Sequence, residues 1–211
     1  MKKLLLSATL LSLGFTALPA TADIGIGADL VNRYVWRGTD FGDAVSVQPS
    51  IAYSTDSFEI GAWSSWGITS NGMNENDLYV SFAAGPVGIT VSDYYFPGYT
   101  GSDGLFDYGS DGAHVIEVMG SFEAGSMSIA AAVNVLGDDD NSLWVELGYG
   151  LGEIDEADVS LSAGLGNGAY TTDGDPMVAS IGISVSKGDY SASYIINPDQ
   201  ETSFLVFGRS F

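Results

Sequence analysis

The chain has 211 residues, of which 27 are acidic and six are basic, giving a formal net charge of −21 at pH 7. This acidity excludes nucleic acid as an expected partner, because phosphate binding needs clustered lysine and arginine. Cysteine is absent, which excludes disulfides, thiolate metal ligands and thiol nucleophiles. The length fits one domain.

The chain begins with the features of an export signal. Lys2 and Lys3 precede an apolar run over residues 4–18, and Ala20-Thr21-Ala22 resembles a cleavage site. We therefore predict a signal peptide over residues 1–22 and a mature domain over 23–211. The apolar run is shorter than the roughly 20 residues of a spanning helix, so we expect any membrane crossing to use strands.

Apolar and polar residues alternate along most of the mature chain, as in strands with one apolar face. Many of these runs have the length of a tilted membrane strand, which needs about 9 to 11 residues. We predict an all-β, single antiparallel transmembrane barrel of about 12 strands, with 10 to 14 possible. The predicted strands lie near residues 24–38, 44–54, 57–69, 77–85, 87–96, 113–123, 126–136, 142–152, 157–167, 177–186, 189–197 and 201–211.

The connections between these strands alternate in length, as short periplasmic turns and long outer loops do in outer-membrane barrels. Tight turns are predicted at 55–56, 85–86, 124–125, 155–156 and 187–188, and longer loops include 70–76, 97–112 and 168–176. A negative outer rim that favours cations should result. Its acidic residues are Asp40, Asp43, Glu75, Asp103, Asp107, Asp111, Asp138, Asp139, Asp140, Asp173, Asp175 and Asp199. The run 138–141 could hold a divalent cation, although a solvated turn is the simpler interpretation, and no metal site is predicted.

Small polar residues occupy the second face of the predicted strands. Such a face leaves room for water in a barrel of this size, so we predict a narrow channel. The 97–112 loop is either its constriction or a surface loop. Aromatic residues near the strand ends predict two membrane-interface girdles. The outer girdle would contain Tyr34, Trp36, Trp63, Trp66, Tyr94, Tyr95, Phe96, Trp144, Tyr170 and Tyr194, and the periplasmic one Tyr53, Phe58, Phe82, Phe122, Tyr149, Tyr190 and Phe211. Some of these rings must face inward instead, because Trp63 and Trp66 have opposite parity on one strand.

Arg33 and Arg37 are four residues apart on the first predicted strand, so they should share its inner face with Asp29. They could bind an anionic group of a substrate. Alternatively, they could form ion pairs with acids that face the lumen. The predicted lumen and selectivity residues are Asp29, Arg33, Arg37, Glu59, Glu117 and Glu146.

The segments 32–38, 47–49 and 58–64 read Asn-Arg-Tyr-Val-Trp-Arg-Gly, Val-Gln-Pro and Phe-Glu-Ile-Gly-Ala-Trp-Ser. Together they resemble the TorF family of exported, porin-like proteins, and the likeness covers roughly residues 24–66. The resemblance implies an outer-membrane barrel with a porin-like role and no defined substrate. It carries over Tyr34, Arg37, Gly38, Gln48, Gly61 and Trp63. The residues that usually follow the Arg-Gly pair are replaced here by Asp40, Phe41 and Val45-Ser46.

The last strand ends in Phe211 with apolar residues at alternate positions before it, which resembles the signal read by the barrel-assembly machinery. We therefore expect export to the outer membrane of a Gram-negative bacterium and contact with its lipid. The predicted function is that of a small porin-like channel for passive diffusion of small hydrophilic solutes or ions, with cations favoured. The alternative is a non-conducting structural or adhesive barrel. No enzyme activity or cofactor is expected, because His114 lacks a nearby serine in sequence.

Overall fold

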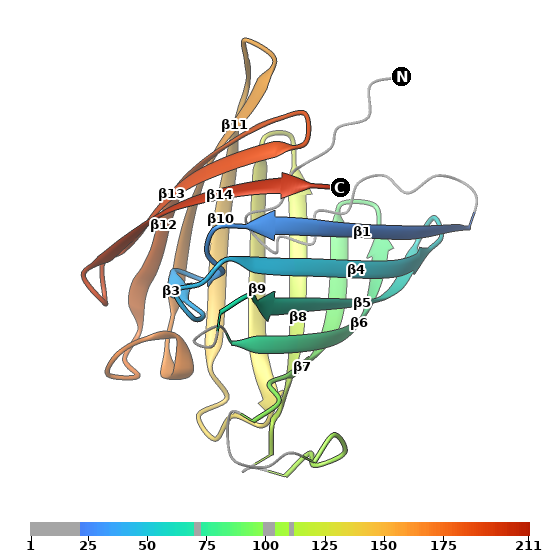
Figure 1. The fold of residues 1–211 in the computed structure, drawn as a ribbon, viewed down its shortest axis with the longest axis vertical. Coiled ribbons are helices and arrows are strands. Elements are labelled where there is room, and N and C mark those ends of the chain that lie inside the picture. Colours follow the sequence, from blue (N-terminus) through green and yellow to red (C-terminus); the bar gives the residue numbers. More distant parts are fainter. Residues whose placement is uncertain (1–21, 70–72, 99–103, 110–111) are drawn as a thin grey trace.

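Twelve strands form one closed antiparallel barrel in a computed structural model that describes residues 22–69, 73–98, 104–109 and 112–211 (Figure 1). Each strand pairs with its neighbours in the sequence, and β1 closes the barrel against β14. The predicted fold class and strand number are therefore confirmed. The wall strands are β1 (Asp23–Val31), β4 (Ser46–Ser54), β5 (Phe58–Gly67), β6 (Asn74–Ala84), β7 (Val87–Tyr95), β8 (His114–Ala124), β9 (Met127–Leu136), β10 (Leu143–Ile154), β11 (Ala157–Gly166), β12 (Met177–Lys187), β13 (Tyr190–Asn197) and β14 (Thr202–Ser210).

The two ends of the barrel differ in their connections. At the end that we call the turn end, β6 and β7, β8 and β9, β10 and β11, and β12 and β13 are joined by two residues each. These turns contain residues with positive φ, as tight hairpins require. The opposite end, the loop end, carries the longer connections, including the short 3-10 helix η1 (Gly168–Tyr170). The predicted alternation of turns and loops is confirmed.

The strands bury their small polar face and expose their apolar face. Large apolar residues such as Ile26, Leu78 and Leu147 are exposed on the outer surface. Many inward side chains are small or polar, as predicted, but the inward set also includes Phe204 and Val206 on β14 and large rings such as that of Trp144 on β10. A barrel with an apolar outer surface is suited to a lipid bilayer, because the acyl chains of the lipid cover the outward apolar side chains.

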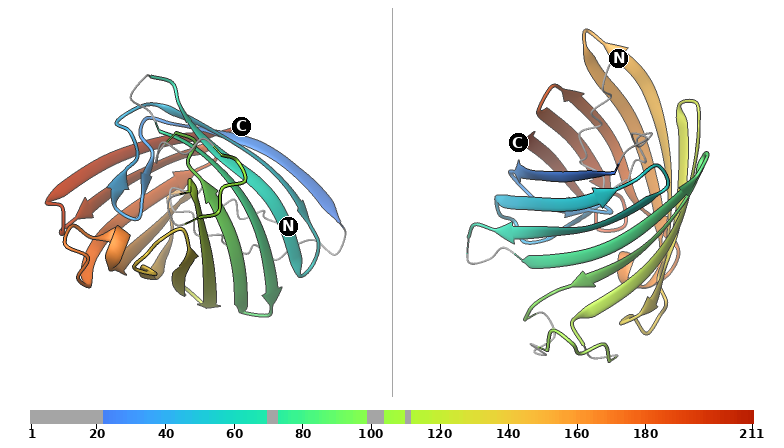
Figure 2. Two further views of the ribbon diagram at one scale, coloured as in Figure 1. Left: turned by 90° about the horizontal axis from the view of Figure 1, so that it is seen from below. Right: turned by 90° about the vertical axis from the view of Figure 1, so that its right-hand side faces the viewer.

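The first predicted strand is too long. β1 ends at Val31, and residues 32–45 leave the wall to form a hairpin of β2 (Val35–Trp36) and β3 (Thr39–Asp40). Figure 2 shows this blue hairpin within the ring of strands. The alternation of residues 24–38 did not reveal the departure, because an inward hairpin is also built from alternating residues. Arg33 and Arg37 therefore do not share one strand face.

The seam between β1 and β14 is short. Only Asp29, Leu30 and Val31 of β1 pair with β14, and the side chain of Asn32 extends the contact. Its Nδ2 donates to the Leu205 carbonyl oxygen at 3.1 Å, and its Oδ1 accepts from the Phe207 amide at 2.7 Å. The asparagine amide thus continues the hydrogen bonding of the seam where the backbone of β1 turns inward.

The predicted outer aromatic girdle is largely wrong, whereas the periplasmic one agrees with the structure. Rings near the loop end mostly face inward and pack around the hairpin, including those of Trp36, Trp63 and Trp144. Trp66 and Tyr194 remain exposed on the outer surface. At the turn end, the exposed outward rings are Tyr53, Phe82, Phe122, Tyr149, Tyr190 and Phe211.

Several predictions concern residues outside the described ranges. The signal peptide lies almost entirely there, as do the acids Asp103 and Asp111 and the middle of the predicted 97–112 constriction. Residues 104–109 of that loop are exposed. Among the described residues, no helix is long and apolar enough to cross a membrane.

Substitution of Asn32 by alanine should destabilise the barrel by about 1 to 3 kcal/mol, because two hydrogen bonds at the seam are lost at about 0.5 to 1.5 kcal/mol each. Urea unfolding of the refolded barrel in detergent measures this change. Asn74→Ala, at the exposed loop end of β6, is the control. Equal midpoints for the two variants would contradict the role given to Asn32.

Candidate functional site

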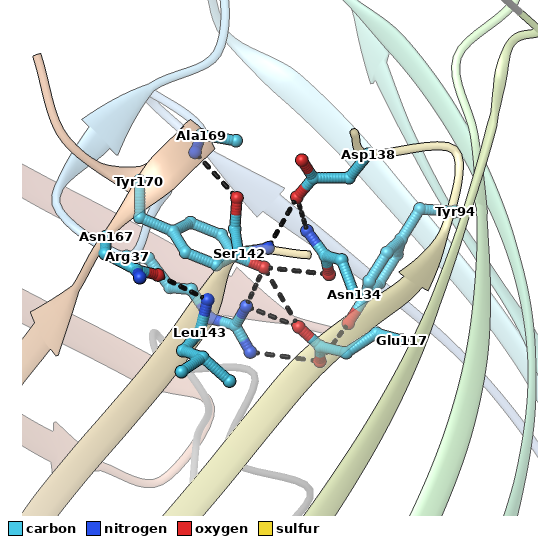
Figure 3. Close-up of polar contacts among 10 residues, drawn as sticks. All are labelled: Arg37, Tyr94, Glu117, Asn134, Asp138, Ser142, Leu143, Asn167, Ala169 and Tyr170. Carbon is cyan, nitrogen blue, oxygen red and sulfur yellow. Dashed lines mark hydrogen bonds and ion pairs between the residues drawn. The ribbon is translucent and has the colours of Figure 1, made fainter. Parts of the chain in front are cut away.

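The tip of the hairpin is tied to the wall of the barrel through Arg37. Its Nη1 donates to Glu117 Oε2 at 2.5 Å and to the Tyr170 hydroxyl at 2.5 Å, and its Nη2 donates to Glu117 Oε1 at 3.0 Å (Figure 3). Glu117 lies on β8, 80 residues along the chain. The Arg37 and Glu117 side chains are 8% and 2% exposed. A bidentate ion pair of this kind is strongly directional.

The turn that presents Arg37 has an unusual backbone. Arg37 and Gly38 both have positive φ, 50° and 80°, which is the pattern of a type I′ hairpin turn. Arginine is uncommon in this conformation, which favours glycine, asparagine and aspartate. Gly38 is required for space as well, because a Cβ there would overlap the carbonyl oxygen of Ala179 on β12. The Asn197 side chain also donates to the Gly38 carbonyl oxygen at 3.1 Å.

Aromatic rings enclose the Arg37 guanidinium. Its central carbon lies 4.4 Å from the centroid of the Trp36 ring, 4.8 Å from that of Tyr170 and 5.3 Å from that of Trp144. Such contacts stabilise a cation that has lost its water. Burial lowers the pKa of Arg37, but Glu117 outweighs burial, so the pKa is raised above its ordinary value and the charge is permanent.

A second layer of hydrogen bonds orients Glu117 and Tyr170. The Tyr94 hydroxyl donates to Glu117 Oε1 at 3.0 Å, and the Tyr170 hydroxyl lies 3.0 Å from Glu117 Oε2 and 3.1 Å from Asn134 Oδ1. Asn134 in turn donates to Asp138. Partial burial of Asp138 raises its pKa, but hydrogen bonds from Ser142 and Asn134 outweigh it, so the pKa stays below its ordinary value.

The loops at this end are therefore joined to the hairpin. Asp138 accepts from the Ser142 amide at 3.0 Å, and the Ser142 hydroxyl accepts from the Ala169 amide at 2.7 Å. The run 138–141 is thus a hydrogen-bonded turn that supports η1 and Tyr170. Its carboxylate at position 138 is used internally, which agrees with the simpler interpretation of this run.

The predicted lumen residues do not form one ladder. Arg33 forms ion pairs with Asp40 and Asp43 inside its own segment, and its guanidinium lies 5.5 Å from the Phe204 ring centroid. Arg37 instead pairs with Glu117, so the alternative of an ion pair with an acid that faces the lumen is realised for Arg37, whereas Arg33 pairs within its own segment. The remaining predicted acids are spread around the wall: Asp29 on β1, Glu59 on β5, which accepts from the Tyr79 hydroxyl at 2.9 Å, and Glu146 on β10, which interacts electrostatically with Arg37.

The residues that carry the TorF resemblance gather mainly around the hairpin. Tyr34 is buried, and its ring packs at 5.5 Å from the Trp63 ring. Gln48 donates to the Ser65 hydroxyl at 3.4 Å. Gly61 lies beneath the Tyr79 ring, where a Cβ would meet the ring at 2.5 Å. The residues of the TorF resemblance therefore belong to the hairpin and to the part of the wall against which the hairpin packs.

Sequence reasoning missed four members of the site around Arg37 and Glu117: Trp144 and Tyr170, which contact Arg37, Tyr94, which donates to Glu117, and Asn134, which bonds to Tyr170. Three of them were predicted as membrane-interface aromatics because they lie near strand ends. On β7, Tyr94 has the same parity as the inward Thr90 and Ser92, so parity was the available signal. For Tyr170, which lies in a connection, no strand periodicity applies.

A cavity of about 280 Å³ opens beside this site at the loop end. Rings of Trp36, Phe41, Tyr94 and Tyr170 line it together with Arg37. Toward the turn end, by contrast, many inward side chains are small and keep contact with solvent. They include Ser50, Ser128, Ser160, Ser162, Ser184 and Ser191. The hairpin therefore obstructs the lumen near the loop end of the barrel, and side chains fill the lumen less toward the turn end.

Fold and site together define a barrel of the outer-membrane type with an internal hairpin. Residues 16–205 match the family described as "Bacterial protein of unknown function (Gcw_chp)", and the chain belongs to this family. The matched family does not carry the TorF name, so that resemblance stays a prediction. No curated protein matches the chain in sequence.

A solved structure supports the fold. It is described as "Unveiling the Mechanism Behind the in-meso Crystallization of Membrane Proteins", and its chain has a TM-score of 0.54 and 8% sequence identity. The similarity covers 90% of this chain and 83% of that chain. At this identity the similarity shows the fold alone, which this chain shares with a structure described in connection with membrane proteins.

Replacement of Glu117 by glutamine should destabilise the barrel by about 3 to 5 kcal/mol, because Arg37 then remains buried without a counter-charge. The double variant R37M/E117Q should lose less than the sum of the two single variants. Urea unfolding of all three refolded variants measures the coupling.

Glu156→Gln provides the matched control. It removes the exposed Lys187–Glu156 pair, whose 3.4 Å contact should contribute less than about 1 kcal/mol. If E117Q were as mild as E156Q, or if the R37M and E117Q effects were additive, the hairpin would not depend on this ion pair.

Proposed function

We propose that the protein is a small porin-like channel of the outer membrane, in which the 32–45 hairpin narrows the lumen. The observation that carries this proposal is the lumen itself. A single hairpin, held at its tip by Arg37, obstructs the loop end, while small polar side chains with solvent contact line much of the wall toward the turn end. Inward loops and rings of charged side chains are the means by which pores select solutes.

Small hydrophilic solutes or ions are the proposed cargo, with cations favoured. The chain is strongly acidic, and exposed acids such as Asp139, Asp140, Asp173 and Asp175 lie in connections at the loop end. Negative charge at a pore mouth raises the local concentration of cations, and salt screens this effect over a Debye length of about 10 Å at 0.1 M. Cation selectivity should therefore weaken as salt rises.

Export and membrane assembly are part of the same proposal. The 1–22 segment would direct export, and the exposed C-terminal Phe211 would be read by the barrel-assembly machinery. The apolar outer surface would then contact outer-membrane lipid. The porin-like role agrees with what the TorF resemblance implies.

The proposed function involves no chemical reaction. His114 is buried, with Nδ1 at 2.7 Å from Asp93 Oδ1 and Nε2 at 2.9 Å from the Leu105 carbonyl oxygen. Both ring nitrogens are thus engaged by groups other than a serine hydroxyl. Lipid hydrolysis by the purified barrel that is lost in His114→Ala would contradict this part of the proposal.

A non-conducting structural or adhesive barrel is the second candidate. The observation that favours it is the hairpin itself, since Gly38, Arg37 and Thr39 contact the opposite wall and loops through Asn197, Glu117 and Gln200. A hairpin bound at several points could close the lumen permanently. The two candidates predict opposite results in a bilayer.

Planar bilayers containing the refolded protein should show discrete, cation-selective steps of current. The R37M/E117Q variant should have a larger conductance, because the hairpin tip is released. Conductance and the reversal potential across a salt gradient are the measurements. Heat-modifiable gel migration verifies that each variant is folded, and E156Q should behave as the unmodified protein.

Absence of current from both the unmodified protein and R37M/E117Q, each verified as folded, would overturn the channel proposal and support a structural barrel. An anion-selective current would overturn the cation preference alone.

A further inference from the structure

Two acidic side chains point together into the loop end of the barrel, separate from the Arg37 site. Glu75 and Asp77 are two residues apart on β6, so both face inward. They are 1% and 5% exposed. Glu75 lies opposite Ser65 on β5, and Asp77 lies between Trp63 on β5 and Tyr94 on β7. The sequence had suggested that Glu75 belongs to the exposed acidic rim, which is wrong.

The hydrogen bonding of this pair is incomplete. The Tyr34 hydroxyl donates to Glu75, and the two carboxyl groups lie within hydrogen-bond reach of each other, a contact that requires a proton on one of them. Glu75 Oε2 and Asp77 Oδ1 nevertheless lie buried without a hydrogen-bond partner among the described residues. Buried carboxylate oxygens of this kind are strongly unfavourable unless a positive charge or a donor reaches them.

No basic side chain of the described chain supplies that charge. Arg33 pairs with Asp40 and Asp43, Arg37 with Glu117, and Lys187 with Glu156. His114 contacts Asp93, and Arg209 lies over the Tyr190 and Phe211 rings at the turn end. The negative charge of Glu75 and Asp77 must therefore be balanced by a proton that the pair shares or by a cation from solution.

We propose that Glu75 and Asp77 form a binding site for a hard divalent cation such as Ca²⁺. Two carboxylates match its charge, and Ca²⁺ accepts hydroxyl and water oxygens in a flexible shell at 2.3 to 2.6 Å. The hydroxyls of Tyr34 and Ser65 are the neutral oxygens next to the pair. Because the described residues contain no cluster of three or more metal-ligating side chains, water completes the shell and the affinity is expected to be low, with a Kd of about 10⁻⁴ to 10⁻³ M.

Cation binding would also connect the wall to the hairpin. Tyr34 belongs to the 32–45 segment, and its ring packs against Phe41 at 5.2 Å and against Trp63 at 5.5 Å. A cation held by Glu75 and Asp77 would fix the Tyr34 hydroxyl and thereby a second point of the hairpin, in addition to the Arg37 contact. The site does not require that the barrel conducts, so it is tested independently of the channel proposal.

Thermal unfolding of the refolded, unmodified chain in detergent, with EDTA or with increasing Ca²⁺, tests the site. The midpoint should rise with Ca²⁺ concentration, because a ligand that binds only the folded state stabilises it. The E75Q/D77N variant should lose this rise, and in EDTA it should be at least as stable as the unmodified protein because two unpaired buried charges are gone.

The matched control is D173N/D175N, which removes the same charge from an exposed loop and should keep the full response to Ca²⁺. An undiminished Ca²⁺ response in E75Q/D77N would place the bound ion on the outer loops and overturn the proposal. An unmodified protein that does not respond to Ca²⁺ would also overturn it, indicating that the two carboxyls share a proton instead.

Terbium luminescence gives a readout that does not depend on the double variant folding. Tb³⁺ binds oxygen ligands as Ca²⁺ does, and nearby aromatic rings sensitise its emission. Emission from the unmodified protein should appear on excitation of tryptophan, fall on addition of Ca²⁺, and decrease several-fold in Trp63→Phe. Emission that Trp63→Phe leaves unchanged would overturn the site.

Discussion

The ion pair between Arg37 and Glu117 determines the internal organisation of this barrel. It joins a hairpin tip to a wall strand 80 residues away, and the loops at that end are arranged around it through Tyr170, Asn134 and Asp138. Both charges are nearly inaccessible to water, so each depends on the other. A buried pair of this kind is sensitive to the loss of either member, so the position of the hairpin tip depends on both residues.

Small residues line the wall for more than one reason. Some of them leave space for water, but others make room for rings that reach across from neighbouring strands. A Cβ at Gly164, for example, would overlap the Trp144 indole, and Gly61 lies beneath Tyr79. Small inward residues in a barrel sequence are therefore ambiguous. They are consistent with an open pore and equally with a pore that accommodates an internal segment.

Acidic residues serve different purposes at different depths. Those in the exposed loops give the rim its charge, Glu117 neutralises Arg37, and Asp40 and Asp43 neutralise Arg33. Glu75 and Asp77 have no such basic partner among the described residues, although they are buried. This imbalance distinguishes them from the other acids and links the charge of the lumen to cations from solution.

The barrel, its twelve strands, the alternation of turns and loops and the inward face of the wall could all be predicted from the amino-acid sequence. These follow from period-two patterning and strand length, which are local properties. The inward turn of residues 32–45, the contact of Arg37 with Glu117 and the burial of Glu75 beside Asp77 became visible only in the folded barrel. Such contacts join residues far apart in sequence, and periodicity contains no information about which inward side chains meet across a lumen.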